Sequence, residues 1–290
     1  MKTSRPTTIA LALLLASCQR CDRERQHAGK DAAARTEDFS SHAPPIRSAG
    51  CGKRSEDADG SAARDVSIRF TDQGRSYVLF VPRGDPDEPR ALVVAFHGSY
   101  SDGAKIRAHL DLEKHAGDRA IFAYPDGLTT AGASAWNLTA AGPDVAFVDA
   151  ILRDVEARFC VDTRSVFAAG LSYGGWMVNA LACARPGVLR GIASIEGGGP
   201  NVPCSGRVAA MIVHGSGDFD EPITSGEASR DHWLEANACG KTAQASSLPQ
   251  CVSYDGCAAG APVLFCRHDG AHVVPDFAPA AVWSFFDRLR

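Results

Sequence analysis

The stretch "GLSYG" at residues 170–174 directly follows the apolar run "VFAA". It places Ser172 between two glycines, each two positions away. It fits G-x-S-x-G, the pattern of a sharp strand-to-helix turn that lifts a serine hydroxyl out of a sheet. Glycine would be needed at both ends because a side chain there would collide with the neighbouring strand or helix. A glycine-rich turn whose serine caps a helix fits the same residues, so the rest of the chain must decide.

A serine hydroxyl is a weak nucleophile, so it needs a base beside it and an acid that orients the base. Asp218 follows the apolar run "MIVHGSG", and His272 follows "LFCRHDGA". We expect His272 to take the proton of Ser172 and return it to the leaving alcohol, while Asp218 fixes the imidazole tautomer and stabilises its cation. The order Ser, Asp, His along the chain is that of the α/β-hydrolase fold, and of neither common serine-protease scaffold.

Other side chains compete for these two roles. His268 lies four residues before His272, and Asp220 lies two residues after Asp218. His272 and Asp218 are favoured because their positions after the strand ends suit loops that can reach the serine. Two further histidines precede glycines at strand ends and are expected to shape loops: His97 and His214.

The oxyanion that forms in acyl transfer needs hydrogen-bond donors already aimed at it. We expect one donor to be the backbone N–H of Tyr173, directly after the nucleophile. The other should come from the loop after "FHG", most simply from the backbone of Ser99. Trp136 could form an apolar wall for an aromatic acyl group or a sugar. It could equally pack in the core, because tryptophan buries well wherever its N–H is satisfied.

The elements that must position these groups alternate between strands and helices. Two strands around Gly74 form an antiparallel pair, and continuous apolar runs such as "ALVVAFHG" indicate strands buried on both faces. Helical spacing covers residues 102–120 and 144–159. We therefore predict a single α/β domain with a mostly parallel, twisted sheet and helices on both faces. In such a sheet functional groups gather at the carboxyl ends of strands.

The N-terminus has the layout of a targeting segment. Lys2 and Arg5 precede the apolar stretch "TTIALALLLAS". The end of this stretch, "LASC", resembles a bacterial lipobox, which predicts a lipoprotein-type signal peptide over residues 1–17 and a lipidated Cys18. An ordinary signal peptide that happens to carry a cysteine is the alternative. By resemblance to enterobacterial sorting rules, Gln19 after the cysteine favours the outer membrane. We therefore expect a protein that is exported and either lipid-anchored to the cell envelope or secreted.

Residues 18–62 are polar and charged, with scarcely any large apolar side chain, and we expect a flexible tether there. The remaining residues, 63–290, are long enough for one domain with a substantial core. A net charge of −4 gives no reason to expect a nucleic-acid partner. No apolar run reaches the length of a membrane span, so any contact with a membrane should pass through the N-terminal anchor.

The chain has ten cysteines. Cys18 is the expected lipid site and Cys21 lies in the expected tether, which leaves an even set that in an exported protein indicates disulfides. Cys51, near the end of the tether, could be bonded to the domain. The spacing matches no common zinc pattern, so a metal site is not expected. We also expect no cofactor. The set is Cys51, Cys160, Cys183, Cys204, Cys239, Cys251, Cys257 and Cys266.

On several pieces the chain resembles the secreted feruloyl esterase and polyhydroxybutyrate depolymerase group of α/β hydrolases. These include "YVLFVP", "LVVAFHGS", "YPDG", "AWN", "IVHGSGD", "WLEANAC", "DGAH" and the specific central piece "DVAFVDAILRDVEARFCVDTRSVFAAGLSYGGWMVNALAC". The resemblance implies that Ser172, Asp218 and His272 take the three catalytic positions. From "FCVD" and "LAC" it also implies a disulfide between Cys160 and Cys183.

Two stretches depart from the pattern of this group. Tyr173 stands where the group often carries Met, Asn or Gln, and "FDEPITSG" after Asp218 replaces the more usual "xxVPYxG". Both could touch the acyl group, so the departures bear on substrate choice and leave the catalytic residues in place.

We expect a serine esterase that cleaves carboxylic esters through an acyl-enzyme. The resemblance favours feruloyl or acetyl esters of plant cell-wall polysaccharide as substrate, with a short-chain polyhydroxyalkanoate depolymerase as the alternative enzyme. A surface binding module on a hydrolase scaffold is the alternative outside the enzymes. The complete order of Ser, Asp and His argues against it, because a binding module has no need of all three.

Overall fold

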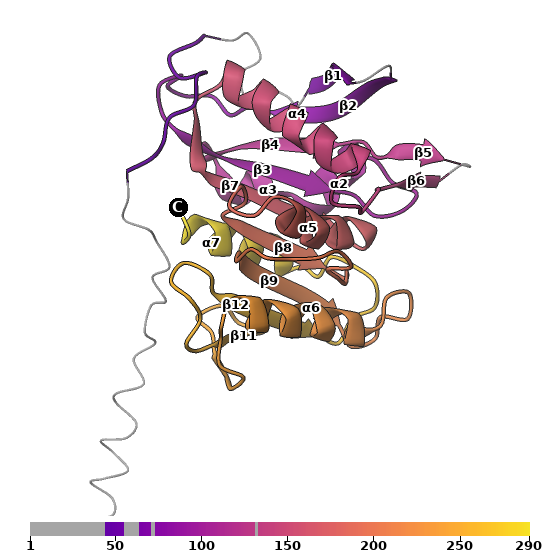
Figure 1. The fold of residues 1–290 in the computed structure, drawn as a ribbon. Helices are drawn as coiled ribbons and strands as arrows, with labels where there is room; N and C mark the ends of the chain where they lie inside the picture. Colours follow the sequence, from indigo (N-terminus) through magenta and orange to yellow (C-terminus); the bar gives the residue numbers. More distant parts are fainter. Residues whose placement is uncertain (1–43, 55–63, 71–72, 131–132) are drawn as a thin grey trace, which may run out of the picture. The chain divides into compact units, whose positions relative to one another are not determined.

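The computed structural model describes residues 44–54, 64–70, 73–130 and 133–290. The expected signal peptide, Cys18 and Cys21 lie outside these residues. The described part holds a ten-stranded sheet with the strand order β1-β2-β4-β3-β7-β8-β9-β12-β11-β10 (Figure 1). Its strands are β1 (Arg64–Phe70), β2 (Gln73–Phe80), β3 (Arg90–Phe96), β4 (Ala120–Pro125), β7 (Val161–Leu171), β8 (Gly191–Ile195), β9 (Ala209–Gly215), β10 (Ala243–Ala245), β11 (Cys251–Tyr254) and β12 (Val263–His268).

The middle of the sheet is parallel and its two edges are antiparallel. Strands β4, β3, β7, β8, β9 and β12 pair in parallel, each with its neighbour in the sheet. At one edge β2 runs antiparallel to both β1 and β4, and at the other β11 runs antiparallel to both β12 and β10. A separate hairpin pairs β5 (Leu128–Thr130) with β6 (Ala133–Ala135). The mostly parallel sheet and the opening antiparallel pair are as predicted.

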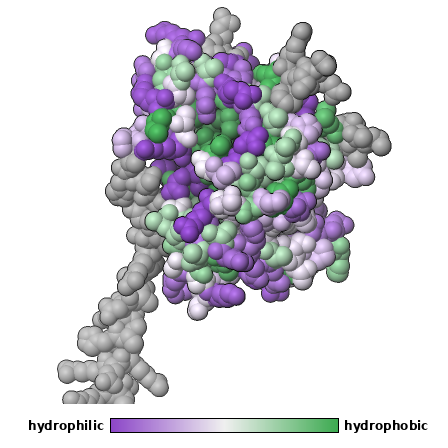
Figure 2. All heavy atoms as spheres, in the orientation of Figure 1, coloured by the Kyte–Doolittle hydropathy of each residue, from purple (hydrophilic) through white to green (hydrophobic). Residues whose placement is uncertain are grey.

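Helices cover both faces of the sheet, which confirms the predicted α/β architecture. One buried apolar cluster takes side chains from α4, α5 and α6, and a second takes them from α2, α3 and α7. Figure 1 shows α4, α5 and α6 in front of the sheet and α7 behind it. On the front face hydrophilic and hydrophobic residues are interspersed (Figure 2). The helices are α2 (Gly103–Leu110), α3 (Leu112–Ala116), α4 (Pro143–Arg158), α5 (Tyr173–Ala184), α6 (Ile223–Ala236) and α7 (Ala278–Asp287).

The predicted helical stretch over residues 102–120 is broken at Asp111. This residue has φ 41° and ψ 36°, and it ends α2 before α3 begins. Aspartate is one of the few side chains that tolerate this left-handed conformation. The stretch predicted as one helix therefore holds two, because the helical spacing of its apolar residues continues past Asp111. Among the described residues, no helix combines the length and apolar composition needed to cross a membrane.

The cysteines from Cys51 onward form four disulfides, as their even number predicted. The bond between Cys160 and Cys183 that the family resemblance implied is wrong. Cys160 follows α4, where residues 44–54 pass, whereas Cys183 lies near the end of α5. The two cysteines therefore belong to different bridges. The pairs are Cys51–Cys160, Cys183–Cys204, Cys239–Cys257 and Cys251–Cys266.

Residues 44–54 are held against the domain although they lie within the predicted tether. Ser48 Oγ donates a 2.7 Å hydrogen bond to the carbonyl of Phe159, and Arg47 forms a β-bridge with Asp162. The disulfide from Cys51 fastens the same segment covalently, which agrees with the expectation that this cysteine could be bonded to the domain. The domain therefore includes residues that composition alone assigned to the tether.

Candidate active site

Ser172 lies at the junction between β7 and α5. Its backbone has φ 57° and ψ −121°, an unfavourable conformation for a residue with a side chain. The backbone N–H of Ser172 is bonded to the carbonyl of Ile195 at 2.8 Å, and its carbonyl accepts from Trp176 at 3.1 Å. Its side chain makes no capping hydrogen bond to α5. The alternative in which Ser172 caps α5 is therefore wrong, because its hydroxyl is not bonded to the helix.

The two glycines of the turn are required by close backbone contacts. A Cβ at Gly170 would lie 2.2 Å from the carbonyl oxygen of Gly174. A Cβ at Gly174 would lie 2.2 Å from the carbonyl oxygen of Phe96 on β3. Real Cβ atoms do not approach other atoms so closely, so one glycine is needed by the helix start and the other by the neighbouring strand, as predicted.

Asp218 and His272 form a hydrogen-bonded pair on the loops that follow β9 and β12. The distance between His272 Nδ1 and Asp218 Oδ2 is 2.6 Å. The other oxygen of Asp218 accepts 2.9 Å hydrogen bonds from the backbone N–H groups of Asp220 and Glu221. Asp220, the competing candidate, thus donates a backbone hydrogen bond to Asp218. Of the two candidate pairs, the geometry selects Asp218 with His272.

Asp218 is buried and nevertheless favours its ionised form. Burial alone would raise its pKa, but the backbone N–H of Glu221 and the side chains of His272 and Glu196 outweigh burial and lower the pKa. A carboxylate that stays ionised keeps the proton of His272 on Nδ1. The Nε2 atom of His272 is then the nitrogen available to act as a base.

The remaining histidines at the strand ends have other partners. His268 Nε2 lies 2.6 Å from Oε1 of Glu196, so the competing histidine is not bonded to Asp218. His97 bonds to the carbonyl of its neighbour Gly98 at 2.7 Å, and His214 bonds to the carbonyl of Glu221 at 2.8 Å. Both agree with the loop-shaping roles that the sequence predicted for them.

A cavity of about 450 Å³ brings the candidate nucleophile and base together. Its lining includes Ser172, His272 and Ser99, the expected oxyanion donor. Tyr173 is the first residue of α5, so its backbone N–H has no acceptor within the helix. The full lining is Gly98, Ser99, Tyr100, Ser101, Ile106, His109, Leu171, Ser172, Asp220 and His272.

Trp136 does not line this cavity, which corrects the prediction that it forms a wall for the acyl group. The residue is 3% exposed, and its ring meets that of Phe96 edge-on, with centroids 5.2 Å apart. Its indole N–H donates a 2.8 Å hydrogen bond to the carbonyl of His97. Because this carbonyl satisfies the N–H inside the core, the alternative of core packing holds.

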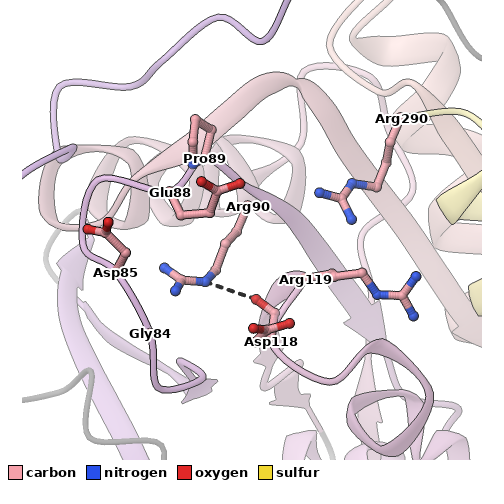
Figure 3. A pocket seen from close by; sticks show the side chains of 8 residues that line it. All are labelled: Gly84, Asp85, Glu88, Pro89, Arg90, Asp118, Arg119 and Arg290. Atoms are coloured by element: carbon pink, nitrogen blue, oxygen red, sulfur yellow. Dashed lines mark hydrogen bonds between the residues drawn. The ribbon is translucent and has the colours of Figure 1, made fainter.

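A second cavity lies at the opposite ends of the strands. It has a volume of about 300 Å³ and includes Arg90, at the start of β3, and Arg119, just before β4. Figure 3 shows Arg90 bonded to the carbonyl of Asp118, at 2.9 Å. This cavity is therefore not part of the candidate active site. Ser172 lies at the carboxyl end of its strand, whereas this cavity lies at the amino ends.

Glu196, directly after β8, is a further polar residue near the site that was not predicted from the sequence. Its side chain is fully buried, and it contacts His268 and the backbone N–H of Gly215. A signal was present, because an acidic residue directly follows the apolar strand "GIASI". Strands β7, β8, β9 and β12 thus each deliver a polar group to one edge of the sheet.

No protein-family model matches the chain. Feruloyl esterase C of Emericella nidulans is 36% identical to it over 237 residues, which cover 73% of this chain and 84% of the relative. Feruloyl esterase D of Neurospora crassa is 30% identical over 272 residues, which cover 84% of this chain and 91% of the relative. The chain belongs to the feruloyl esterase C/D family. Membership of the feruloyl esterase C/D family makes it a carboxylic ester hydrolase and confirms the family resemblance.

Among solved structures, this chain is similar to an acetyl xylan esterase from Aspergillus awamori. The TM-score is 0.64 with 14% sequence identity, over 79% of this chain and all of the other. At this identity the likeness bears on the fold alone, which is the α/β-hydrolase fold.

Proposed function

We propose that the protein hydrolyses feruloyl esters of plant cell-wall polysaccharide through an acyl-enzyme on Ser172. Family membership gives the ester-hydrolase chemistry and the substrate class. One observation carries the assignment of residues: His272, joined to Asp218 at 2.6 Å, lines the same cavity as Ser172 at its strained turn.

In the first half-reaction, His272 Nε2 takes the proton of the Ser172 hydroxyl as Oγ attacks the carbonyl carbon of the ester. The tetrahedral intermediate collapses, the bond to the sugar oxygen breaks, and His272 returns the proton to the leaving alcohol. In the second, His272 takes a proton from water as the water oxygen attacks the acyl carbon. The bond between the acyl carbon and Ser172 Oγ then breaks, His272 returns the proton to Oγ, and the carboxylic acid leaves. Asp218 stabilises the imidazolium that forms in both steps.

The negative charge that develops on the carbonyl oxygen needs donors fixed before the reaction begins. We assign this role to the backbone N–H groups of Tyr173 and Ser99. The loop that carries Ser99 passes directly over the nucleophile, since a Cβ at Gly98 would lie 3.6 Å from Ser172 Oγ. The N-terminal end of α5 adds a favourable electrostatic field for an anion at the same point.

The lining of the cavity favours an aromatic acyl group. Ile106 and Leu171 supply apolar surface inside it, and Tyr100, which is 77% exposed, supplies an aromatic ring at its edge. Phe219, next to Asp218, is 94% exposed. Its loop also borders the cavity through Asp220, whereas Tyr173 packs against the core. Of the two departures from the family pattern, the "FDEPITSG" loop is therefore the one that bears on substrate choice.

We also propose that the protein is exported and anchored through a lipid on Cys18. Four disulfides support an oxidising compartment, because such bonds rarely persist in a reducing cytosol. The anchor rests on the motif "LASC" in the sequence. Mass spectrometry of the mature N-terminus tests it: a modified Cys18 at the first position supports the anchor, and any other unmodified N-terminus contradicts it.

A substrate panel tests the proposed function. Methyl ferulate, acetylated xylan, p-nitrophenyl acetate and oligomers of 3-hydroxybutyrate should be compared by kcat/KM, with Ser172→Ala as the inactive control. We expect methyl ferulate to be preferred over the acetyl esters and the oligomers. Preference for hydroxybutyrate oligomers would contradict the substrate class. Equal turnover by wild type and Ser172→Ala would contradict the site itself.

A further inference from the structure

Glu196 is a second buried carboxyl group beside the Asp218–His272 pair. It directly follows β8, has φ 47° and is fully buried. Side-chain polar atoms of Glu196, Asp218 and His272 lie within 4.8 Å of one another. Two carboxyl groups this close, with little solvent, cannot both carry a charge at low cost, so one of them should hold a proton.

The neighbouring donors favour Asp218 as the charged member. Asp218 accepts two backbone N–H bonds and the Nδ1–H of His272. Glu196 accepts the backbone N–H of Gly215 at 2.9 Å and a bond from His268. Burial, together with the adjacent Asp218, raises the pKa of Glu196 to about 8, whereas the pKa of Asp218 is lowered. The proton of the carboxyl pair therefore belongs on Glu196.

Two further histidines are packed against this pair, and each has hydrogen-bond partners of its own. The Nδ1 atom of His268 accepts from the N–H of Gly270 at 3.1 Å, so its Nε2 carries the hydrogen that Glu196 accepts. Burial lowers the pKa of His268, which keeps the ring neutral. His214 Nε2 lies 3.7 Å from both Glu196 and Asp218 and donates to the backbone.

We propose that Glu196 is a positioning residue whose neutral carboxyl donates a hydrogen bond to the Asp218 carboxylate and holds it in line with His272. The inference rests on the proposed catalytic roles of Asp218 and His272. Ionisation of Glu196 removes this donor and places a second negative charge beside the first. The carboxylate of Asp218 then loses its fixed orientation, so turnover should fall as the pH rises through the ionisation of Glu196.

Two variants separate positioning from simple packing. Glu196→Gln keeps a neutral donor toward Asp218 but cannot ionise. We expect kcat within about tenfold of wild type at pH 7, and an alkaline fall in kcat/KM that no longer occurs near pH 8. Glu196→Leu keeps the bulk and loses the donor, and we expect kcat to fall by about 10- to 100-fold with little change in KM. Ser194→Ala, a buried polar change on the same strand, is the matched control and should keep the alkaline fall of wild type.

The pH series should be run both with methyl ferulate and with the rate of covalent labelling by a fluorophosphonate, which does not depend on the natural ester. An unchanged alkaline fall in Glu196→Gln would overturn the inference, and so would wild-type kcat in a folded Glu196→Leu. If Glu196→Leu does not fold, the Glu196→Gln profile decides. Absence of labelling at Ser172 in the wild type would instead overturn the proposed function, which keeps the two failures distinguishable.

Discussion

His272 is bonded to Asp218, with 2.6 Å between Nδ1 and Oδ2, whereas His268, four residues earlier, is bonded to Glu196. His268 is the last residue of β12 and His272 lies on the loop that follows it, so their positions in the sequence alone do not identify the base. Their partners do, because only His272 combines a bond to the buried Asp218 with a position on the cavity that holds Ser172.

This difference predicts unequal effects of removing the two imidazoles. His272→Ala should lower kcat by about 10⁴-fold or more, because the serine hydroxyl without its base is a poor nucleophile near neutral pH. His268→Ala should cost much less, since this ring touches the reaction only through Glu196. Steady-state kinetics on both variants, with circular dichroism to confirm folding, makes the comparison. A larger loss in His268→Ala than in His272→Ala would reverse the assignment of the base.

The glycines around Ser172 predict a sharp steric effect on stability. Gly174→Ala would place a Cβ 2.2 Å from the carbonyl oxygen of Phe96, which is backbone and cannot move aside cheaply. We expect a loss of several kcal/mol or failure to fold. Gly74→Ala is the control, because none of the residues that the structure describes lies within 4 Å of a Cβ there. Urea unfolding of both proteins measures the difference, and equal stability of the two variants would contradict the close packing at the turn.

The sequence could predict the parallel centre of the sheet and the polar groups at its carboxyl edge, because both follow from local patterns. Buried strands appear as apolar runs, and the residue after each run is the one that reaches the site. The break at Asp111 and the short edge strands β10 and β11 could not be predicted. A single left-handed residue leaves the apolar spacing intact, and strands of three or four residues carry too little alternation to be recognised.

Contacts between distant parts of the chain account for the remaining differences. Whether Cys160 bonds to Cys51 or to Cys183 depends on where residues 44–54 pack, which local sequence does not contain. Trp136 lies in the core because the carbonyl of His97 satisfies its N–H. The role of Glu196 likewise appears only when four strand ends are brought together.

The disulfide map gives a prediction with a direct chemical readout. Peptide mapping without reduction should recover Cys51 linked to Cys160, and Cys183 linked to Cys204. Replacing both Cys51 and Cys160 by serine should lower the free energy of unfolding by about 3–5 kcal/mol, because this bridge joins residues 109 positions apart and restricts the unfolded chain strongly. Recovery of a Cys160–Cys183 peptide from the folded protein would contradict this connectivity.

The buried carboxyl of Glu196 predicts a pH dependence of stability. Its pKa is raised from an ordinary 4.5 to about 8 in the folded protein, so the unfolded chain releases this proton at lower pH than the folded one. The contribution of Glu196 to stability is therefore fully present below pH 4.5, and it is lost between pH 4.5 and 8 at up to about 1.4 kcal/mol per pH unit.

Glu196→Gln removes this titration and is the natural comparison. The free energy of unfolding of both proteins should be measured with urea from pH 5 to 8.5. As the pH rises, the wild type should lose stability relative to Glu196→Gln. A difference that stays constant across this range would show that Glu196 does not keep its proton in the folded protein.

The most direct test of the whole account is to find which residue a fluorophosphonate labels. The wild-type protein should gain one phosphonyl group, and peptide mass spectrometry should place it on Ser172, while Ser172→Ala should remain unlabelled, keep its fold and lose ester hydrolysis. Labelling of a different serine, or full hydrolysis of methyl ferulate by folded Ser172→Ala, would contradict the assignment of Ser172 as the nucleophile.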